Sequence, residues 1–451
     1  MKRGAGMDRK LFDNAALKRL IIPLVIEQFL AVFMGMMDMI MVSSCGEAAI
    51  SGVNLADSIN ILIINVLAAL ATGGAVVASQ YLGKQEPENA SKSAKQLIYS
   101  SLIFALALAI GSMLFCKPLL GFVFGSVDAE VMGNATTYFF ITAISYPFLA
   151  LYNSGASLFR AMGDSKVSMK VSMITNIENI VGNYIMIFPL QMGVAGAAIS
   201  TLVSRLTGAV IMLVLLKKEE NPIHIKKYLH FEWSNSLVSK ILAVGLPSGM
   251  ENGIFQLGKI LVQSLVSTFG LSAIAANSVG STMASVCTIP AAAIGLALVT
   301  VVGQCMGAGK PEEAAYYMKK LTGIAYVCIF VTAALTYLSL PFIFRLYQLS
   351  PETMTIAREL AVSFCIACVI FWPASFTFPN GLRAANDARY TMVVSVLSMW
   401  IFRVGSAYVF AQYMNMGVMG VWFAMYLDWI VRLLFFVLRF KSGKWQRRKL
   451  V

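Results

Sequence analysis

Long apolar segments alternate with short polar ones along most of the chain. The first apolar segment, from Leu20 to Val42, would span roughly 34 Å as a helix, which is enough to cross a bilayer. Eleven further segments have the same character, at residues 50–82, 97–115, 131–159, 167–189, 194–216, 237–269, 272–306, 314–340, 353–382, 390–413 and 418–440. This pattern predicts an all-α integral membrane protein with twelve transmembrane helices.

Composition supports a membrane protein and explains the high positive charge. The chain is 58% hydrophobic and 13% charged, and its mean hydropathy is +0.74. Its net charge of +13 would fit nucleic acid binding, but most of its Lys and Arg residues fall on one side if the N-terminus is placed inside. We therefore expect a multi-pass protein of the inner (plasma) membrane with both termini in the cytoplasm, and no nucleic acid partner.

A long polar segment near the middle divides the chain. Residues 217–236 are expected to form a cytoplasmic linker between an N-lobe of six helices at 17–216 and a C-lobe of six helices at 237–440. Residues 1–16 are expected to form a cytoplasmic arm, and 441–451 a basic cytoplasmic tail.

The two halves repeat each other at a nearly constant spacing. The offset of 224 residues relates Pro23 to Pro247, Glu27 to Glu251, Gln80 to Gln304, Gly83 to Gly307 and Gly193 to Gly417. Because each half has an even number of spans, both halves enter from the same side and the repeat is parallel. Two parallel bundles around a midplane cavity are typical of transporters that work by alternating access.

The first apolar segment carries two carboxylates. Glu27 and Asp38 lie eleven residues apart, which returns almost to the same face of a helix at about 100° per residue. A carboxylate in hydrocarbon costs about 2.5 kcal/mol or more, so it marks an ion or proton pathway by default. Glu27 repeats as Glu251, whereas the counterpart of Asp38 is Val262. This asymmetry favours Asp38 as the coupling residue, with Glu27 and Glu251 either structural or a second coupling site.

Several motifs in order resemble one transporter family across nearly the whole chain. They are MMDMIMVSSCGEAAISGVNLA, the paired loops SQYLGKQEPENA and GQCMGAGKPEEAA, FRAMGDSKVSM with its partner LRAANDARYTM, and MGVAGAAIST. The sequence resembles the multidrug and toxic compound extrusion (MATE) family, and within it the DinF-like bacterial branch. The resemblance implies a V-shaped pair of six-helix lobes and a cation-coupled antiporter that exports organic, often cationic, compounds.

The resemblance also implies a cation-coupling site in the N-lobe, formed by Asp38, Asn179, Asn183 and Thr201. Two amides at i, i+4 on one helical face, a hydroxyl and a carboxylate make an oxygen-rich pocket that could hold Na⁺ or stabilise Asp38 in either protonation state. Many relatives carry an aspartate where this chain has Asn183, so a proton is favoured over Na⁺. The acidic residues of another branch's C-lobe Na⁺ site fall near Phe255 and Phe371, which indicates that this second site is absent.

Other charged residues within the apolar segments are candidates for a second coupling or substrate-sensing role, namely Glu27, Glu251, Glu178, Lys259 and Arg403. The alternatives for them are structural. Lys259 lies two turns after Glu251 and could pair with it, and Glu178 could pair with a basic residue of another helix. Asp428 and Arg432 stand at i, i+4 and are also expected to pair. Arg403 occupies the repeat position of Asn179.

These features favour a proton-coupled multidrug efflux antiporter. The alternatives are Na⁺-coupled efflux of the same substrates, or a lipid-linked precursor flippase, which would need a strongly cationic central cavity. An enzyme is not expected, because the two histidines, His224 and His230, lie in the central loop. No cofactor, resident metal or ATP is expected, since the Gly-Lys loops lack the GxxxxGK[ST] spacing. The expected partners are small organic substrates and membrane lipid, and the expected oligomeric state is a monomer.

Overall fold

The computed structural model describes residues 10–125, 127–228, 230–346 and 350–448. The first nine residues of the predicted arm and the last three of the basic tail lie outside this part. All regular elements described are helical. The α-helices are α1 (Asn14–Ser43), α2 (Glu47–Gly83), α3 (Pro87–Leu114), α4 (Cys116–Phe124), α5 (Ala129–Ile144), α6 (Tyr146–Ala161), α7 (Ser165–Ile187), α8 (Gly193–Leu215), α9 (Asn235–Ser267), α10 (Leu271–Gly307), α11 (Pro311–Leu346), α12 (Pro351–Trp372), α13 (Pro379–Ala384), α14 (Ala388–Leu397), α15 (Ser406–Tyr408) and α16 (Gly417–Lys441).

Three short π-helical segments interrupt the helices of the second half, and one 3₁₀ turn follows α16. The π-helical segments are η1 (Pro373–Thr377), η2 (Ser398–Gly405) and η3 (Val409–Tyr413), and the 3₁₀ turn is η4 (Lys444–Arg447). Segments of π-helix are rare and are frequent at functional sites. The first half has no such segment within its described residues.

The helices account for the twelve predicted spans. Within the described residues, nine helical segments are long and apolar enough to cross a membrane, and the bent pair α5 and α6 makes a tenth. Two further long helices, α7 with 23 residues and α9 with 33, complete the set. The chain therefore has the predicted twelve-helix architecture.

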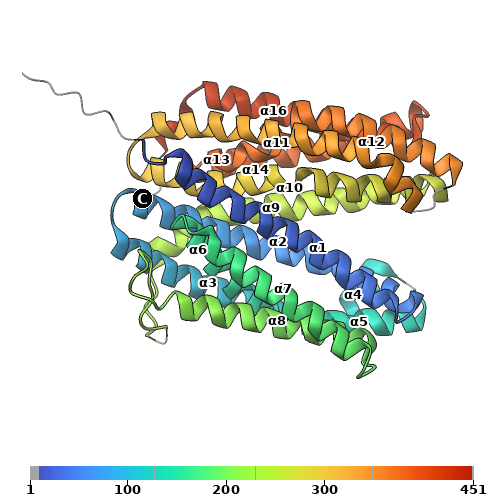
Figure 1. Ribbon diagram of the computed structural model, residues 1–451, viewed down its shortest axis with the longest axis horizontal. Helices are drawn as coiled ribbons and strands as arrows, with labels where there is room; N and C mark the ends of the chain where they lie inside the picture. The colour runs from blue at the N-terminus through green and yellow to red at the C-terminus, as the bar shows by residue number, and fades with distance from the viewer. Residues whose placement is uncertain (1–9, 126, 229, 347–349, 449–451) are drawn as a thin grey trace, which may run out of the picture.

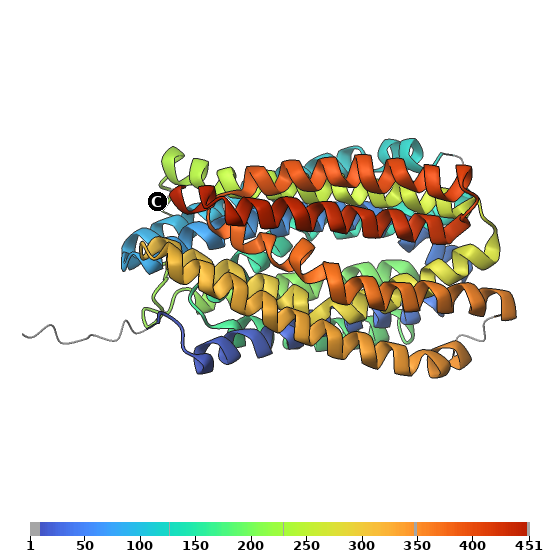
Figure 2. The ribbon, with the colours of Figure 1, turned by 90° about the horizontal axis from the view of Figure 1, so that it is seen from above.

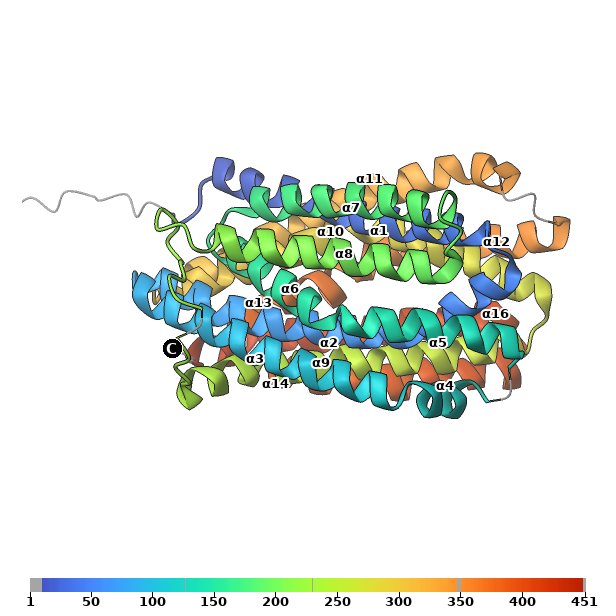
Figure 3. The same ribbon diagram turned by 90° about the horizontal axis from the view of Figure 1, so that it is seen from below.

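The predicted span at 131–159 is not one straight helix. It consists of α5 and α6, which meet at Ser145 with a bend of 49° (Figure 3). Pro147 explains part of the break, because proline has no N–H to continue the helical hydrogen bonds. The bend leaves the hydroxyl of Ser145 available inside the N-lobe. The short helix α4, at the same side of the bundle as the start of α5, was not predicted.

The sequence repeat is also a repeat of backbone conformation. Positive φ angles recur 224 residues apart at Gly46 and Gly270 (104° and 91°), at Gly193 and Gly417 (both 54°), and at Gln191 and Asn415 (50° and 55°). Such angles cost little only for glycine, and are uncommon for other residues. Equivalent turns in each half therefore start equivalent helices.

The helices form two lobes that diverge from a common end. In Figure 1, α7 and α8 of the N-lobe spread away from α11 and α16 of the C-lobe, while α1, α2, α9 and α10 lie between them. Helix α2 packs against α9, and α1 packs in the equivalent way against α10. The blue start of α1 and the red end of α16 lie at one end of the molecule, which we call the terminal end (Figure 2).

Two glutamines link the lobes at the terminal end in a reciprocal way. Nε2 of Gln80 in α2 donates to the carbonyl oxygen of Ala384 in the C-lobe at 2.8 Å. Nε2 of Gln304 in α10 donates to the carbonyl oxygen of Ala161 in the N-lobe at 2.7 Å. Because the two glutamines are repeat equivalents, each lobe holds the other by the same contact.

Close approach of α2 and α10 at this point requires glycine. A Cβ atom at Gly307 would lie 1.9 Å from the carbonyl oxygen of Gln80, and one at Gly83 would lie 2.0 Å from that of Gln304. We expect Gly307→Ala to force the lobes apart at the terminal end and to lower the free energy of unfolding by about 1–3 kcal/mol. Thermal unfolding in detergent measures this loss.

The matched control is Gly323→Ala in α11, where a Cβ atom would meet nothing within 4 Å. This change should stabilise the helix slightly, because alanine is the better helix former. Equal unfolding temperatures for the two variants would contradict the close contact between α2 and α10.

Candidate cation-coupling site

The four residues predicted to form the N-lobe site lie in one hydrogen-bonded chain. Nδ2 of Asn183 in α7 donates to Oδ1 of Asp38 in α1 at 2.6 Å and to Oδ1 of Asn179 at 3.3 Å. Nδ2 of Asn179 donates in turn to Oγ1 of Thr201 in α8 at 3.3 Å. Three helices thus bring Asp38, Asn183, Asn179 and Thr201 together, and their role in coupling stays a prediction.

Close packing of α7 on α8 places the two amides inside the lobe. Asn179 and Asn183 are fully buried. Gly182, between them in sequence, lies so close to α8 that a Cβ atom there would be 2.4 Å from Oγ of Ser200. The Ser200 hydroxyl donates to the carbonyl oxygen of Asn179 at 2.8 Å. The glycine therefore sets the distance at which the amides of α7 reach Thr201.

One buried acceptor in this series of hydrogen-bonded side chains has no partner. Oδ1 of Asn183 makes no hydrogen bond within the described residues, although its amide nitrogen donates twice. A buried unpaired acceptor is costly, and it favours the arrival of a proton donor or a cation. Amide, hydroxyl and carboxylate oxygens are also ligands that suit hard cations. The donor set therefore fits either a proton on Asp38 or Na⁺.

A second polar network, not predicted from the sequence, begins at Asp57 in α2. Oδ1 of Asp57 accepts from Nδ2 of Asn60 at 3.1 Å, and Oδ1 of Asn60 accepts from the Tyr146 hydroxyl at 2.6 Å. Nδ2 of Asn60 also donates to Oγ1 of Thr142 at 3.2 Å. A polar pair at i, i+3 inside the apolar segment 50–82 was the available signal.

Arg205 of α8 places a positive charge beside both acids. Its Nη1 donates to Oγ of Ser145, at the bend between α5 and α6, at 2.6 Å. Asp38 and Asp57 are its electrostatic neighbours, but no carboxylate of the described residues lies within 4.0 Å of it. The N-lobe thus holds two acids and one base that are not closed into an ion pair. We call Asp38, Asp57, Asn179, Asn183, Thr201 and Arg205 the N-lobe cluster.

Glu27 and Glu251 are bound in equivalent buried ion pairs, away from the N-lobe cluster. Oε1 of Glu27 lies 3.1 Å from Nη1 of Arg160, and Oε2 accepts from Ser168 at 2.7 Å. Oε1 of Glu251 lies 2.6 Å from Nη2 of Arg383. The alternative that Glu251 pairs with Lys259 is wrong, because Arg383, distant in sequence, is closer in space.

These ion pairs support the contact between the lobes. Arg160 and Arg383 each precede the alanine whose carbonyl oxygen accepts from a glutamine of the other lobe. The carbonyl oxygen of Arg160 also accepts from Thr300 of the C-lobe at 2.9 Å. The geometry therefore favours the structural alternative for Glu27 and Glu251.

Glu178 has a different partner from the one expected. Its Oε1 accepts from the Thr207 hydroxyl of α8 at 2.9 Å, and no basic residue of the described chain pairs with it. The expected pair of Asp428 and Arg432 is confirmed at 2.8 Å. Nη1 of Arg403 lies 4.0 Å from the second carboxylate oxygen of Asp428.

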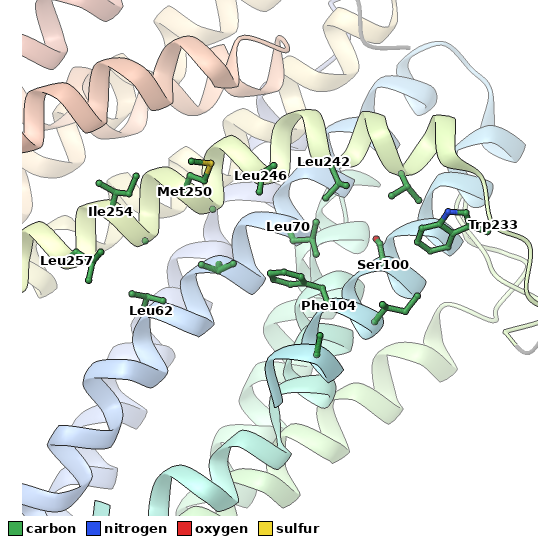
Figure 4. Close-up of a pocket in the computed structure, with 17 residues that line it drawn as sticks. Leu62, Leu70, Ser100, Phe104, Trp233, Leu242, Leu246, Met250, Ile254 and Leu257 are labelled. Carbon is green, nitrogen blue, oxygen red and sulfur yellow. The ribbon is translucent and has the colours of Figure 1, made fainter. Parts of the chain in front are cut away.

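Two cavities lie near these groups, and they differ in chemistry. The larger, of about 610 Å³, is an apolar groove between α2, α3 and α9, with Leu62, Phe104, Leu246 and Met250 among its lining residues (Figure 4). Its lining has almost no polar groups that could bind an ion. The smaller, of about 340 Å³, lies inside the C-lobe and contains the charged side chains of Lys259 and Arg403.

Twelve membrane-spanning helices in two repeated lobes, with charged side chains at the lobe interface and inside each lobe, define a multi-pass membrane transporter. A MatE family model matches residues 23–185 and 247–409, one match in each half of the chain. The chain belongs to the MATE family of transporters.

Related proteins cover nearly the whole chain. The probable multidrug resistance protein NorM of Thermotoga maritima is 26% identical over 95% of this chain and 92% of that protein. The uncharacterized transporter YisQ of Bacillus subtilis is 28% identical over 97% and 99%. A solved outward-facing structure of a multidrug resistance MATE family transporter of the MOP superfamily superposes with a TM-score of 0.88 at 22% identity, over 95% of this chain and 96% of that one. The predicted fold class is confirmed.

The buried, ion-paired glutamates and the half-buried Asp38 should differ in their effect on stability. Glu27→Gln and Glu251→Gln each leave a largely buried arginine without its partner, so we expect the free energy of unfolding to fall by about 3 kcal/mol. Asp38→Asn removes no ion pair, and should change it by less than about 1 kcal/mol. Thermal unfolding of the three variants in detergent compares them. A loss for Asp38→Asn as large as for Glu27→Gln would show that Asp38 is structural.

Proposed function

We propose that the protein is a secondary active multidrug efflux transporter that exchanges organic compounds for protons, with Asp38 as the proton carrier. Relatives named as probable multidrug resistance proteins support efflux. The carboxylate of Asp38 accepts from the buried amide of Asn183, which in turn donates to Asn179, and this supports the choice of carrier. The coupling ion and the antiport mechanism are the parts that experiment must test.

The observation that carries this proposal is the unpaired Oδ1 of Asn183. When Asp38 is ionised, its carboxylate accepts from Nδ2 of Asn183, as in the present geometry. When Asp38 is protonated, its O–H becomes a donor and needs an acceptor. A half-turn of the Asn183 amide supplies Oδ1 for that purpose. The same side chain can thus satisfy both protonation states, which suits a group that takes up and releases a proton.

Helix α1 connects this site to the contact between the lobes. It carries Asp38 toward one end and Glu27 nearer the terminal end, and it packs on α10 of the C-lobe. A change of hydrogen bonding at Asp38 would favour one position of α1, and hence one arrangement of the lobes. Alternation would break and remake the reciprocal contacts of Gln80 and Gln304.

Charge balance restricts the energetics. Exchange of one proton for one monovalent cation moves no net charge, so only the pH gradient drives it, with about tenfold accumulation per pH unit. A neutral substrate, or a second proton, would add about 2.3 kcal/mol per 100 mV of membrane potential. Asp57 is a candidate for that second proton, because it is an electrostatic neighbour of Asp38.

We expect Asp38→Asn to abolish efflux driven by an imposed pH gradient, because the amide cannot release a proton. Ethidium efflux from proteoliposomes, with an acid step on the side opposite the termini, measures it. Asp128→Asn is the control, since Asp128 is an exposed residue at the start of α5 and asparagine keeps its capping hydrogen bond. Wild-type efflux that ignores the pH gradient but follows Na⁺ would overturn proton coupling.

The Na⁺ alternative has its own test at Asn183. We expect Asn183→Asp to add a second carboxylate to the N-lobe cluster, which should strengthen Na⁺ binding and make efflux respond to a Na⁺ gradient. Asn176→Asp on the same helix is the control, because Asn176 is buried and, among the described residues, its side chain bonds only to Ser172. An equal Na⁺ response in the two variants would contradict a cation site at Asn183.

The lipid-linked precursor flippase remains a second candidate, because Lys259 and Arg403 make one cavity cationic. That cavity lies within the C-lobe and has a volume of about 340 Å³, which favours a small molecule over a large lipid-linked head group. We further propose that the terminal end faces the cytoplasm of a cell with this protein in its inner membrane, and that the transporter works as a monomer. The DinF-like assignment stays a prediction.

A further inference from the structure

The C-lobe cavity has cationic groups and aromatic walls. It lies between α9, α10, α12, η1, η2 and α16, and Lys259 and Arg403 are its charged lining residues. No carboxylate lines it. Its aromatic lining residues are Phe255, Phe364, Trp372, Phe376, Trp422 and Trp429.

This cavity lies in the C-lobe at the place that corresponds, by the sequence repeat, to the hydrogen-bonded side chains around Asp38 in the N-lobe. Val262, Arg403 and Met425 line it. The residues 224 positions earlier are Asp38, Asn179 and Thr201. At equivalent places, the N-lobe therefore has an acid, an amide and a hydroxyl, whereas the C-lobe has an apolar side chain, a guanidinium and a thioether. The two lobes present opposite charge at the same structural position.

Positive charge is in excess around the cavity. Asp428 is fully buried behind it and is shared between Arg432, at 2.8 Å, and Arg403, at 4.0 Å. Lys259 makes no ion pair with any carboxylate in the part of the chain that the structure describes. One carboxylate thus stands against three cations, and two of those cations reach the cavity.

The cavity also has hydrogen-bond donors that lack acceptors. Nε1 of Trp429, a residue only 3% exposed, and Nε of Arg403 are buried and have no partner among the described residues. Of the oxygens nearby, Oδ1 of Asn277 accepts from Trp422 at 2.8 Å and Oε1 of Gln263 accepts from Asn277 at 2.9 Å. Oδ2 of Asp428 is 4.0 Å from Nη1 of Arg403, too far for a hydrogen bond. Buried unpaired donors beside cations require an acceptor, and an anion is the strongest one.

We propose that this cavity is a binding subsite for small aromatic anions, with the ring against the tryptophans and a carboxylate or sulfonate toward Lys259 and Arg403. The proposal rests on the proposed transport function, and it adds amphipathic organic anions to the organic compounds that the transporter exports. Inward movement of a proton and outward movement of an anion both carry positive charge inward. Export of such a substrate is therefore driven by an inside-negative membrane potential as well as by the pH gradient.

A binding experiment tests the anion subsite independently of which ion drives transport. Two probes share one ring and differ in charge: 2-naphthalenesulfonate and 2-naphthylmethylammonium. Calorimetric titration of the full chain in phosphatidylcholine nanodiscs should show the sulfonate binding about tenfold tighter or more, as expected for a charge-assisted hydrogen bond. Equal or tighter binding of the ammonium probe would overturn the proposal.

Lys259 is the variant of choice, because it has no ion pair to lose. We expect Lys259→Gln to weaken sulfonate binding about tenfold and Lys259→Glu to reverse the preference between the probes. Lys117→Gln removes the same charge from an exposed position outside the cavity and should leave both affinities unchanged. An unchanged preference in Lys259→Glu would show that the anion binds elsewhere.

Transport separates this proposal from the proposed function. In proteoliposomes with the potential clamped by potassium and valinomycin, sulfonate efflux should rise with an inside-negative potential in the wild type and equally in Lys117→Gln. Anion binding at Lys259 without proton-driven efflux of any probe would support the subsite and overturn proton coupling. Loss of sulfonate binding when phosphatidylglycerol is added to the nanodiscs would overturn a soluble substrate, since a lipid head group would then hold the site.

Discussion

A charge inside hydrocarbon costs about 2.5 kcal/mol or more unless it is paired or hydrated. This cost determines how the charged side chains within the helices are arranged. At the terminal end, the charges are closed into ion pairs between Glu27 and Arg160 and between Glu251 and Arg383. Deeper in the lobes, the charges are only partly satisfied. The N-lobe leaves an amide oxygen of Asn183 without a donor, and the C-lobe leaves the indole N–H of Trp429 and Nε of Arg403 without acceptors and Oδ2 of Asp428 without a donor. The first kind of site stabilises the lobes, and the second kind is available for ions and substrates.

The parallel repeat explains how one chain holds both kinds of site. Contacts that join the lobes are kept in both halves, because each half must bind the other at the same place. The glutamines, glycines and ion pairs of the terminal end are therefore duplicated. Groups inside the lobes are free to differ, and they do. Asp38 faces α7 in one lobe, whereas Val262 and Arg403 line a cavity in the other. The two lobes therefore differ in charge, with an acidic cluster in the N-lobe and a cationic cavity in the C-lobe.

The contact between the lobes is formed by helices that also carry charged side chains. Helices α1, α2, α9 and α10 pack at the contact between the lobes, and three of them carry charged groups: Asp38 in α1, Asp57 in α2 and Lys259 in α9. A change of charge in the N-lobe cluster or in the C-lobe cavity therefore acts on a helix that packs at the contact between the lobes. Hydrogen bonds from side-chain amides to carbonyl oxygens are individually weak, about 1 kcal/mol each, so a few of them can be exchanged during a transport cycle.

Local periodicity was enough to predict the twelve spans, the repeat, the shared face of Asn179 and Asn183, and the pair of Asp428 and Arg432. Each of these depends on residues within a few turns of one helix, or on a comparison of the two halves. The tertiary structure decided which helix faces met. It paired Glu251 with Arg383 instead of Lys259, linked Asp57 through Asn60 to Tyr146 at the start of α6, and formed the C-lobe cavity. Helical spacing fixes the face on which a side chain lies, but its partner depends on the packing of all the helices at once, because contacts between distant segments have no period in the sequence.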